Sequence, residues 1–489
     1  MAGNKKRSST LILLLLAMIA LILACFWITG YKEKEAKIET GEETSEESII
    51  SLDVDTIKSI YFKNENAEMT LLLNDQGVWK SAEDDDLPLN QSNAENMKNA
   101  FAKVNSSRTI TEGMEDLASF GLDNPAIHVV VTDHDGAKTD LLIGDKLPVG
   151  SGYYAILNGG KEIYVINNSF YNNFNIKAKE MVSVESIPTI TASNITYLSV
   201  KNQEKPNFEV TYDENLNSDY STFTKWIIKQ PYPTDIAADA DALTSLFGNY
   251  TDLTFLSCAD YRATDLSKYG LKDPTAVITL KYHEEEGKEE KEFALFIGSR
   301  DEEGNYYVKL KDSNAVNTLG SDTVSKLLEI DVYSYAYHNI NLFLLDAIDS
   351  VDIKLKDQTY TLLVERSKQN ADTEESTDKA DDAKSDTDSI KYYVNGSLVE
   401  ESEFKNLYQQ IISPTTEREI PAEYYLSSST NRTPIMTVTY HFTDGHSVAI
   451  QYLPYDESYY VVDNNGVEYF LTDLRVINDI AEAVKKFSK

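Results

Sequence analysis

The segment LASFGLDNPAIHVVVT, residues 117–132, places a proline eight residues after a leucine and directly before a strand-like apolar run. The same arrangement recurs at Leu266–Pro274 (LSKYGLKDP) and, without the glycine, at Leu426–Pro434 (LSSSTNRTP). A turn follows each run, and in the first and third copies it is the Asp-Gly pair that favours a tight hairpin. We therefore interpret most of the chain as three tandem copies of one unit.

Pairs of tyrosines recur in the same order, 153 residues apart on both occasions. They are Tyr153-Tyr154, Tyr306-Tyr307 and Tyr459-Tyr460. Successive side chains of a strand point to opposite faces, so we expect one tyrosine of each pair to pack and the other to face outward. The six rings are candidate interaction residues, because a row of aromatic faces suits a glycan or a partner protein. The alternative is that tyrosine is simply a good strand residue.

Each copy predicts an α+β module in which mainly antiparallel hairpins are covered by two short helices. The predicted ranges are 51–189 for repeat module 1, 190–338 for module 2 and 339–489 for module 3. The first helix of each module is expected near 92–104, 238–249 and 401–412. A low-complexity tract at 367–389, with eight acids and three lysines, predicts a disordered acidic insert at a loop tip of module 3.

The N-terminal region carries a membrane-like signal. Lys5, Lys6 and Arg7 precede an apolar run from Leu11 to Thr29, which as a helix would extend about 28 Å at ~1.5 Å per residue. The run predicts a transmembrane helix over 11–30 that inserts into the lipid bilayer, with a cytoplasmic basic tail at 1–10 and an acidic linker at 31–50. The expected location is a single-pass cell-membrane protein with its bulk extracytoplasmic. A lipoprotein signal acylated at Cys25 and a cleaved secretory signal are the alternatives.

Composition excludes some classes of protein. The 489 residues include 45 Lys and Arg against 80 Asp and Glu, a formal net charge of −35. The three predicted modules carry −10, −11 and −13, so the acidity is spread over all of them. We expect no nucleic-acid partner, because neutralising phosphates needs a basic face. Two cysteines, one of them inside the apolar run, exclude a disulfide framework.

Motifs that carry chemistry are not evident in the sequence. None of the six histidines belongs to a metal-ligand spacing, and no nucleophile elbow, Walker loop or dinucleotide fingerprint occurs. Cys258 is interpreted as a small buried hydrophobe. We expect no catalytic, cofactor-binding or metal site, and hence not an enzyme. An acid pair without a recognisable motif is the alternative.

The repeated features resemble a known family. They are Gly-Leu-x-x-Pro in the first two copies, Ile143-Gly144-Asp145, Ile297-Gly298-Ser299 and the tyrosine pairs. Together they are similar to the bacterial family catalogued as domain of unknown function 4340. The likeness covers residues 51–489 and is weakest in the third copy. It implies an extracytoplasmic, membrane-anchored protein, often encoded beside an ABC exporter of the gliding-motility type, and it supplies no catalytic residues.

Two functional hypotheses follow from repeated modules without catalytic motifs. The first is a non-enzymatic accessory or interaction component of a cell-envelope complex such as that exporter, whose partner is a membrane or envelope protein. The second is an extracytoplasmic ligand-binding protein for cell-wall glycan or peptide, which uses exposed aromatic side chains between the modules.

Overall fold

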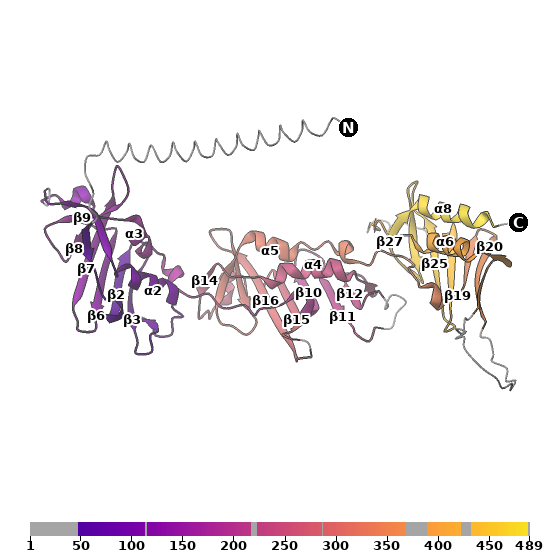
Figure 1. Ribbon diagram of the computed structural model, residues 1–489, viewed down its shortest axis with the longest axis horizontal. Helices are drawn as coiled ribbons and strands as arrows, with labels where there is room; N and C mark the ends of the chain where they lie inside the picture. The colour runs from indigo at the N-terminus through magenta and orange to yellow at the C-terminus, as the bar shows by residue number, and fades with distance from the viewer. Residues whose placement is uncertain are drawn as a thin grey trace, which may run out of the picture. The chain divides into compact units, whose positions relative to one another are not determined.

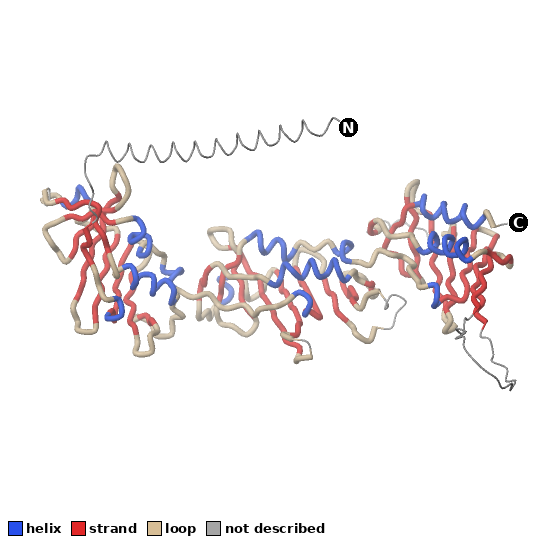
Figure 2. The backbone as a smooth tube through the Cα atoms, in the orientation of Figure 1, coloured by secondary structure: helices blue, strands red, loops and turns tan. Residues whose placement is uncertain are grey.

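The computed structural model describes residues 47–112, 115–216, 223–285, 287–367, 389–421 and 432–487. Within these residues the chain is mostly antiparallel β-sheet, with three sheets of nine strands each and six short α-helices (Figures 1 and 2). It forms two compact units, Met1–Ser183 and Val184–Lys489. The first unit contains the first sheet, and the second unit contains the other two.

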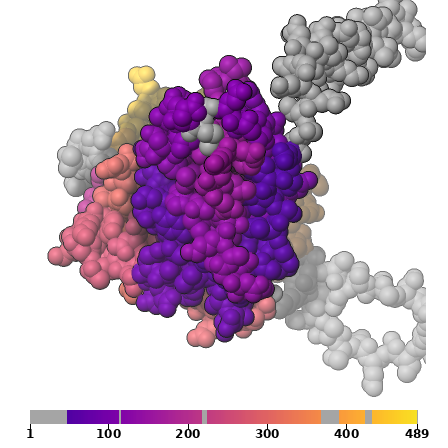
Figure 3. All heavy atoms as spheres, turned by 90° about the vertical axis from the view of Figure 1, so that its left-hand side faces the viewer, coloured from indigo at the N-terminus to yellow at the C-terminus, as the bar shows by residue number. Residues whose placement is uncertain are grey.

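The first sheet joins two meanders. Strands β2 to β4 pair in succession, strands β6 to β9 do the same, and β2 pairs with β6 in the middle. In the space-filling view, strands that come later in the sequence of this module therefore lie between strands that come earlier (Figure 3). The strand order is β1-β5-β9-β8-β7-β6-β2-β3-β4, with β1 at Glu47–Ile50, β2 at Ile57–Asn64, β3 at Glu68–Leu73, β4 at Trp79–Ser81, β5 at Val104–Ile110, β6 at Ile127–Asp133, β7 at Lys138–Lys146, β8 at Tyr153–Leu157 and β9 at Ile163–Ile166.

The second and third sheets repeat this topology and differ from the first mainly at their edges. The second sheet, β13-β12-β11-β10-β15-β16-β17-β18-β14, uses β10 at Ile195–Asn202, β11 at Phe208–Tyr212, β12 at Trp226–Gln230, β13 at Ile236–Ala237, β14 at Ser257–Asp260, β15 at Ala276–His283, β16 at Glu290–Arg300, β17 at Tyr306–Leu310 and β18 at Val316–Leu319. The third, β22-β21-β20-β19-β24-β25-β26-β27-β23, uses β19 at Ile348–Leu355, β20 at Gln358–Ser367, β21 at Ser389–Val394, β22 at Ser397–Val399, β23 at Arg418–Glu419, β24 at Met436–Phe442, β25 at Ser447–Pro454, β26 at Tyr459–Asn464 and β27 at Val467–Asp473.

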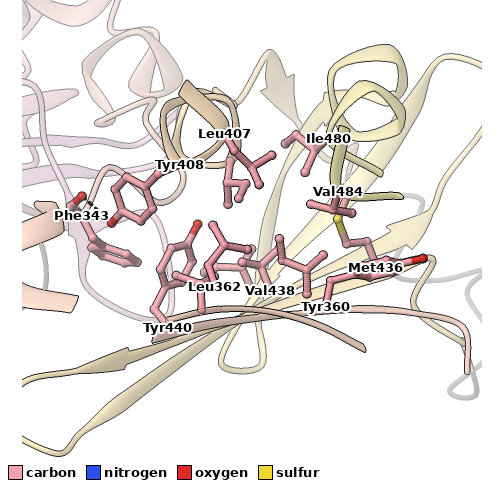
Figure 4. Packing of buried hydrophobic residues seen from close by; sticks show 14 of the residues in the cluster. Phe343, Tyr360, Leu362, Leu407, Tyr408, Met436, Val438, Tyr440, Ile480 and Val484 are labelled. Atoms are coloured by element: carbon pink, nitrogen blue, oxygen red, sulfur yellow. Dashed lines mark hydrogen bonds between the residues drawn. The ribbon is translucent and has the colours of Figure 1, made fainter. Parts of the chain in front are cut away.

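Two helices pack on one face of each sheet and complete the main core of that module. They are α2 (Gln91–Ala100) and α3 (Asn168–Phe174), then α4 (Ala240–Thr251) and α5 (Ser321–Leu328), then α6 (Glu401–Ile412) and α8 (Leu474–Lys485). In the third module, Leu407 of α6 and Ile480 of α8 stand over Leu362 and Val438 of the sheet (Figure 4). Helix amides at the start of several helices are satisfied by a capping side chain, as Asp239 does for α4.

The recurrent glycines allow one close backbone approach. The 3₁₀ turn Leu117–Phe120 (η2) ends at Gly121 with φ of 66°, and its main chain lies directly on Gly144 of β7. A Cβ atom at Gly144 would stand 2.2 Å from the carbonyl oxygen of Phe120. The second module repeats this contact, because a Cβ at Gly298 would stand 2.1 Å from the carbonyl oxygen of Tyr269. The two motifs named in the sequence are therefore the two sides of one packing contact.

The fold class predicted from the sequence, an α+β protein with an N-terminal transmembrane helix, is wrong. The described chain is mostly β, although its three sheet modules agree with the predicted threefold repeat. The longest described helices have 12 residues, about 18 Å at ~1.5 Å per residue, which is shorter than a bilayer core of ~30 Å. No helix among the described residues is long and apolar enough to span a membrane.

The predicted single-pass membrane location is corrected for the same reason, because no described helix supports it. The predicted tail at 1–10, the bilayer-inserted anchor at 11–30 and the linker up to residue 46 lie outside the described residues. So do residues 368–388 of the predicted acidic insert and residues 422–431, which include the first six residues of the third Leu-to-Pro motif, 426–431.

Replacing Gly298 tests the close backbone approach. Gly298→Ala forces a methyl group into a main-chain oxygen, and we expect a loss of about 1–3 kcal/mol in the free energy of unfolding. Gly248→Ala is the matched control, since Gly248 lies in α4 with open space around it, and we expect a gain of about 0.5–1 kcal/mol. Thermal unfolding of both full-length variants measures the difference. Equal melting temperatures would contradict the role given to Gly298.

Candidate functional site

The tyrosines predicted as interaction residues lie on equivalent strands, β8, β17 and β26. In the first module they alternate as expected. Tyr153 stacks on Tyr171 of α3 with ring centroids 3.7 Å apart, whereas Tyr154 meets Phe120 of η2 edge-on at 5.0 Å on the other face. In this pair, therefore, both rings pack within their own module.

The second pair is also packed within its module. The guanidinium of Arg300 lies 4.4 Å from the ring centre of Tyr306, and its Nη2 donates to the phenol oxygen at 2.8 Å. Tyr307 meets Tyr269 edge-on, with centroids 5.0 Å apart.

The third pair is displaced by one position relative to the other two. Tyr153 pairs with Ile166 across the sheet, but in the third module Tyr460 rather than Tyr459 takes that place, opposite Thr472. Tyr460 is buried and donates to Asn478 of α8, whereas Tyr459 lies under Arg418, 4.3 Å from the ring centre to the guanidinium. Since all six rings have partners inside their own modules, a ligand-binding role for them stays a prediction.

The strongest candidate site is instead the junction of the second and third modules, inside the second unit. Its centre is the segment 335–340, which begins at the last residue of the 3₁₀ turn Val332–Tyr335 (η6) and connects the two sheets. On one side this segment pairs with the second module: Asp239 N–H donates to the Tyr335 carbonyl at 2.9 Å, and Tyr337 N–H donates to the Ala237 carbonyl at 2.8 Å. An antiparallel bridge between Ala238 and Ala336 lies between these bonds.

The same segment pairs with the third module through its other residues. Thr416 N–H donates to the His338 carbonyl at 2.8 Å, and Ile340 N–H donates to the Pro414 carbonyl at 3.2 Å. An antiparallel bridge joins Asn339 to Thr415. Odd-numbered residues thus bond to the second module and even-numbered residues to the third, as the alternation of a strand's backbone groups requires. The connection is a shared strand and not a free linker.

An aromatic cluster packs beside this shared strand. Tyr232 from the second module contacts Tyr469 and Phe470 of β27, with ring centroids 5.1 and 5.7 Å apart. Tyr333 adds a contact to Phe470 at 5.6 Å and stacks on His338 at 4.5 Å. Phe470 belongs to the third sheet but packs against the core of the second module. The two modules therefore share apolar packing as well as backbone hydrogen bonds.

Two tyrosine hydroxyls of this cluster bond across the junction. The Tyr232 hydroxyl donates to the Glu419 carboxylate of β23, and the Tyr333 hydroxyl donates to Thr416 Oγ1 at 3.2 Å. Burial raises the pKa of both phenols, and the Glu419 carboxylate raises that of Tyr232 further. Both hydroxyls therefore stay protonated and act as donors at neutral pH.

The junction leaves a cleft of about 620 Å³ between residues of both modules. Its lining includes aromatic rings and amide side chains. The rings are those of Tyr337, Tyr469 and Phe470, and the amides are those of Asn339, Asn464 and Asn465. Among its described lining residues, Asp235 is the one charged side chain, and it is ion-paired with Lys229 at 2.6 Å. Rings and amides of this kind can bind a neutral polar ligand by stacking and by hydrogen bonds.

This junction was not predicted from the sequence. Tyr333, Tyr335 and Tyr337 alternate in the segment between the two repeats, but Tyr333 and Tyr335 lie in the 3₁₀ turn Val332–Tyr335, so this period-2 pattern does not indicate the pairing. The pairing itself is made by backbone groups, which leave no trace in the residue types.

Other reactive groups have structural surroundings. In the described part of the chain no cluster of three or more His, Cys, Asp or Glu residues could hold a metal ion. His128 and His441 lie on sheet surfaces, 3.1 and 3.2 Å from the carboxylates of Asp140 and Asp352. Cys258 is buried, as expected, and burial raises the pKa of its thiol to about 11.

The junction can be tested with Tyr232→Phe, which removes the hydroxyl that donates to Glu419. We expect the second unit to lose about 0.5–1.5 kcal/mol of stability and the amides of 335–340 to exchange faster with deuterium. Tyr393→Phe is the matched control, because it deletes a 2.9 Å bond to Glu365 at the surface and should change stability by less than about 0.5 kcal/mol. Unchanged amide exchange in Tyr232→Phe would contradict a role in holding the modules together.

The buried thiol of Cys258 predicts that the stability of the folded protein depends on pH. Because the folded pKa of Cys258 lies above its ordinary value of 9.0, the neutral form is favoured in the folded state. Its contribution to stability is present below pH 9.0 and is lost as the pH rises toward about 11. In a Cys25→Ala background, Ellman's reagent at mildly alkaline pH should therefore modify Cys258 only after denaturant is added. Rapid labelling of the folded protein would show that the thiol is accessible.

The comparison with protein families gives one result. The family model of a domain of unknown function (DUF4340) matches residues 79–230 and again residues 226–413. This confirms both the family resemblance and its tandem occurrence. No curated protein and no solved structure matches the chain.

Proposed function

Since the chain belongs to the family defined by the domain of unknown function DUF4340, we propose that it is a non-enzymatic binding protein that serves as an accessory component of a larger protein assembly. The resemblance in its sequence makes an ABC exporter of the gliding-motility type the first assembly to test. The observation that carries the proposal is the junction of the second and third modules, which holds two sheets together while leaving a cleft lined by both.

A rigid junction would preorganise the cleft for binding. A binding surface made from two modules keeps its shape only if the modules do not move against each other, because ordering them on binding would cost affinity. Here the shared strand 335–340 and the contacts of Tyr232 with Phe470 oppose such movement. Apart from Asp235, the side chains that line the cleft are uncharged rings, amides, aliphatic groups and one hydroxyl, which favour recognition over acid-base chemistry.

The partner can be identified by site-specific crosslinking in cells. A photoreactive amino acid at Asn465, on the rim of the cleft, should form a crosslink to one defined protein, and components of an exporter are the expected products. The same amino acid at Asn158 is the matched control, because Asn158 occupies the equivalent hairpin turn in the first module with nearly the same φ, 52° against 53°. The absence of any crosslinked protein at residue 465 would contradict the proposal.

A ligand-binding protein for glycan or peptide is the second candidate, and the composition of the cleft favours it. Its volume of about 620 Å³ lies within the range of about 300–1,000 Å³ typical of small-molecule sites. Asn465 has a φ of 53°, so Asn465→Gly removes an amide without straining the turn.

Purified cell-wall muropeptides are the probe for this candidate. Titration by calorimetry should show binding to the full chain, and we expect Asn465→Gly to weaken it about five- to tenfold through the loss of a hydrogen bond. Asn158→Gly should bind as the unmodified chain does. Saturable binding with no change in Asn465→Gly would place the ligand elsewhere, and no binding at all would reject this second function.

A further inference from the structure

The segments that leave the first two modules pair with equivalent residues of the module they leave. In the first module Asn90 N–H donates to the Met181 carbonyl at 2.8 Å, and Ser183 N–H donates to the Pro88 carbonyl at 2.6 Å. The Leu89–Val182 bridge lies between these bonds. In the second module the residues 237–239 and 335–337 repeat the arrangement bond for bond. In both cases the acceptor residues immediately precede the first helix of the module.

The third module has the same acceptor position at Leu398–Glu400. Its register is fixed by the helix caps, because Asn90, Asp239 and Glu400 are the N-cap residues of α2, α4 and α6. Strand β22 is the outermost strand of the third sheet, and no described residue pairs with its outer side. The residue before the N-cap is Leu89 in the first module and Ala238 in the second, 4% and 0% exposed, and its equivalent in the third module, Val399, is partly buried against the core.

The free backbone groups of this edge point outward. A two-residue turn at Asn395-Gly396, both with positive φ, closes the β21–β22 hairpin. In such a hairpin the residues next to the turn exchange hydrogen bonds, so Ser397 and Val399 bond inward to β21. The Leu398 carbonyl and the Glu400 N–H therefore face away from the sheet, as the Ala237 carbonyl and Asp239 N–H do in the second module.

The core beneath the edge is already closed. Helix α8 extends further than α3 and α5 and places the fully buried Val484 over the third sheet. The Asn395 amide donates to the Phe487 carbonyl at 3.3 Å, which joins the segment after α8 to the hairpin turn. The third module thus needs no leaving segment to cover its core, and its edge stays open without exposing the interior.

We propose that the edge Leu398–Glu400 accepts an extended peptide segment of a partner protein as an added antiparallel strand. The residue opposite Leu398 would be apolar, since Leu398 continues a cross-strand row with Leu363 and Tyr393 on the outer face. The segment would carry a lysine or arginine near Glu400, because Glu401 and Glu403 follow in the first turn of α6. A second copy of this chain is the poorer occupant, since its net charge of −35 opposes self-association. The proposal does not depend on the junction cleft.

The chain supplies its own probe. A fluorescent peptide with the sequence of residues 331–340, DVYSYAYHNI, contains the segment that pairs with the second module. Added to the purified full chain, it should raise fluorescence anisotropy in a saturable way, and a scrambled peptide should not. A peptide with Ser334→Lys, which places a cation near Glu400, should bind several-fold tighter at low salt and lose that gain at high salt.

Two proline variants locate the peptide. Glu400→Pro removes the outward N–H while keeping the backbone, because Glu400 already has φ of −65°. We expect it to weaken peptide binding about fivefold or more, the equivalent of one backbone hydrogen bond. Glu401→Pro is the matched control, because it loses the same charge but keeps the outward N–H, at the first helical position where proline is favoured. The native peptide carries no lysine or arginine, so Glu401→Pro should bind this peptide nearly as tightly as the unmodified chain does. Matching circular dichroism and melting temperatures would show that both variants fold.

The outcomes separate the possibilities. No preference for the native peptide over the scrambled one, or equal binding by Glu400→Pro and Glu401→Pro, would overturn the proposal. Sedimentation of the chain alone provides a further test. Dimers that disappear in Glu400→Pro would show that a second copy occupies the edge, which would also overturn the partner assignment. A monomer that binds the peptide in the expected order would support it.

Discussion

Backbone pairing at the edges of open sheets is the constraint on which this architecture depends. An open sheet presents a row of unpaired N–H and C=O groups at each edge, and these must meet water or another strand. In the second module the segment that leaves the module, at 335–337, pairs with the edge strand β13 and the residues after it, and in the first module the segment 181–183 pairs with residues 88–90, which lie between the sheet and α2. The segment at 335–337 then continues into pairing with the third module. This shared strand accounts for the division into two compact units, with the second and third sheets together in one of them.

The repeat defined by sequence and the module defined by pairing are out of phase. The two family matches begin at the strands that carry Trp79 and Trp226, and the first ends within the second of these strands. The first sheet instead begins three strands earlier, at β1, and the second begins two strands earlier, at β10. A tandem array can be divided at any point of its period, so both descriptions are valid. Only the pairing shows that a segment such as 335–340 belongs to two modules at once.

The sequence predicted local features well and relations between distant segments poorly. Some features follow from short-range patterns, and the structure contains them. They are the Asp-Gly turns, the strands after each proline and the helix at 401–412. The predicted fold class is wrong because the nine-stranded sheets outweigh the short helices, and no described helix is long and apolar enough to span a membrane. The equal spacing of the tyrosine pairs was misleading in another way. The bulge after Ile143 and after Ile297 has no counterpart between β25 and β26, which shifts the third pair by one residue. The junction was missed because its pairing is made by backbone groups and because the side-chain bonds of Tyr232 and Tyr333 join residues far apart in the sequence.

The acidic surface acquires a physical role once the edges are considered. Charged side chains along an exposed strand are a common device against pairing with another copy, because like charges would be brought together. Here the net charge of −35 is spread over all three modules, and Glu400 stands on the open edge itself. Two copies of the chain would approach this edge with unfavourable electrostatics, whereas a basic segment would be attracted to it and oriented by the same carboxylates. The charge that keeps an unpaired edge from aggregating is therefore also what makes the edge selective, and the two properties need no separate explanation.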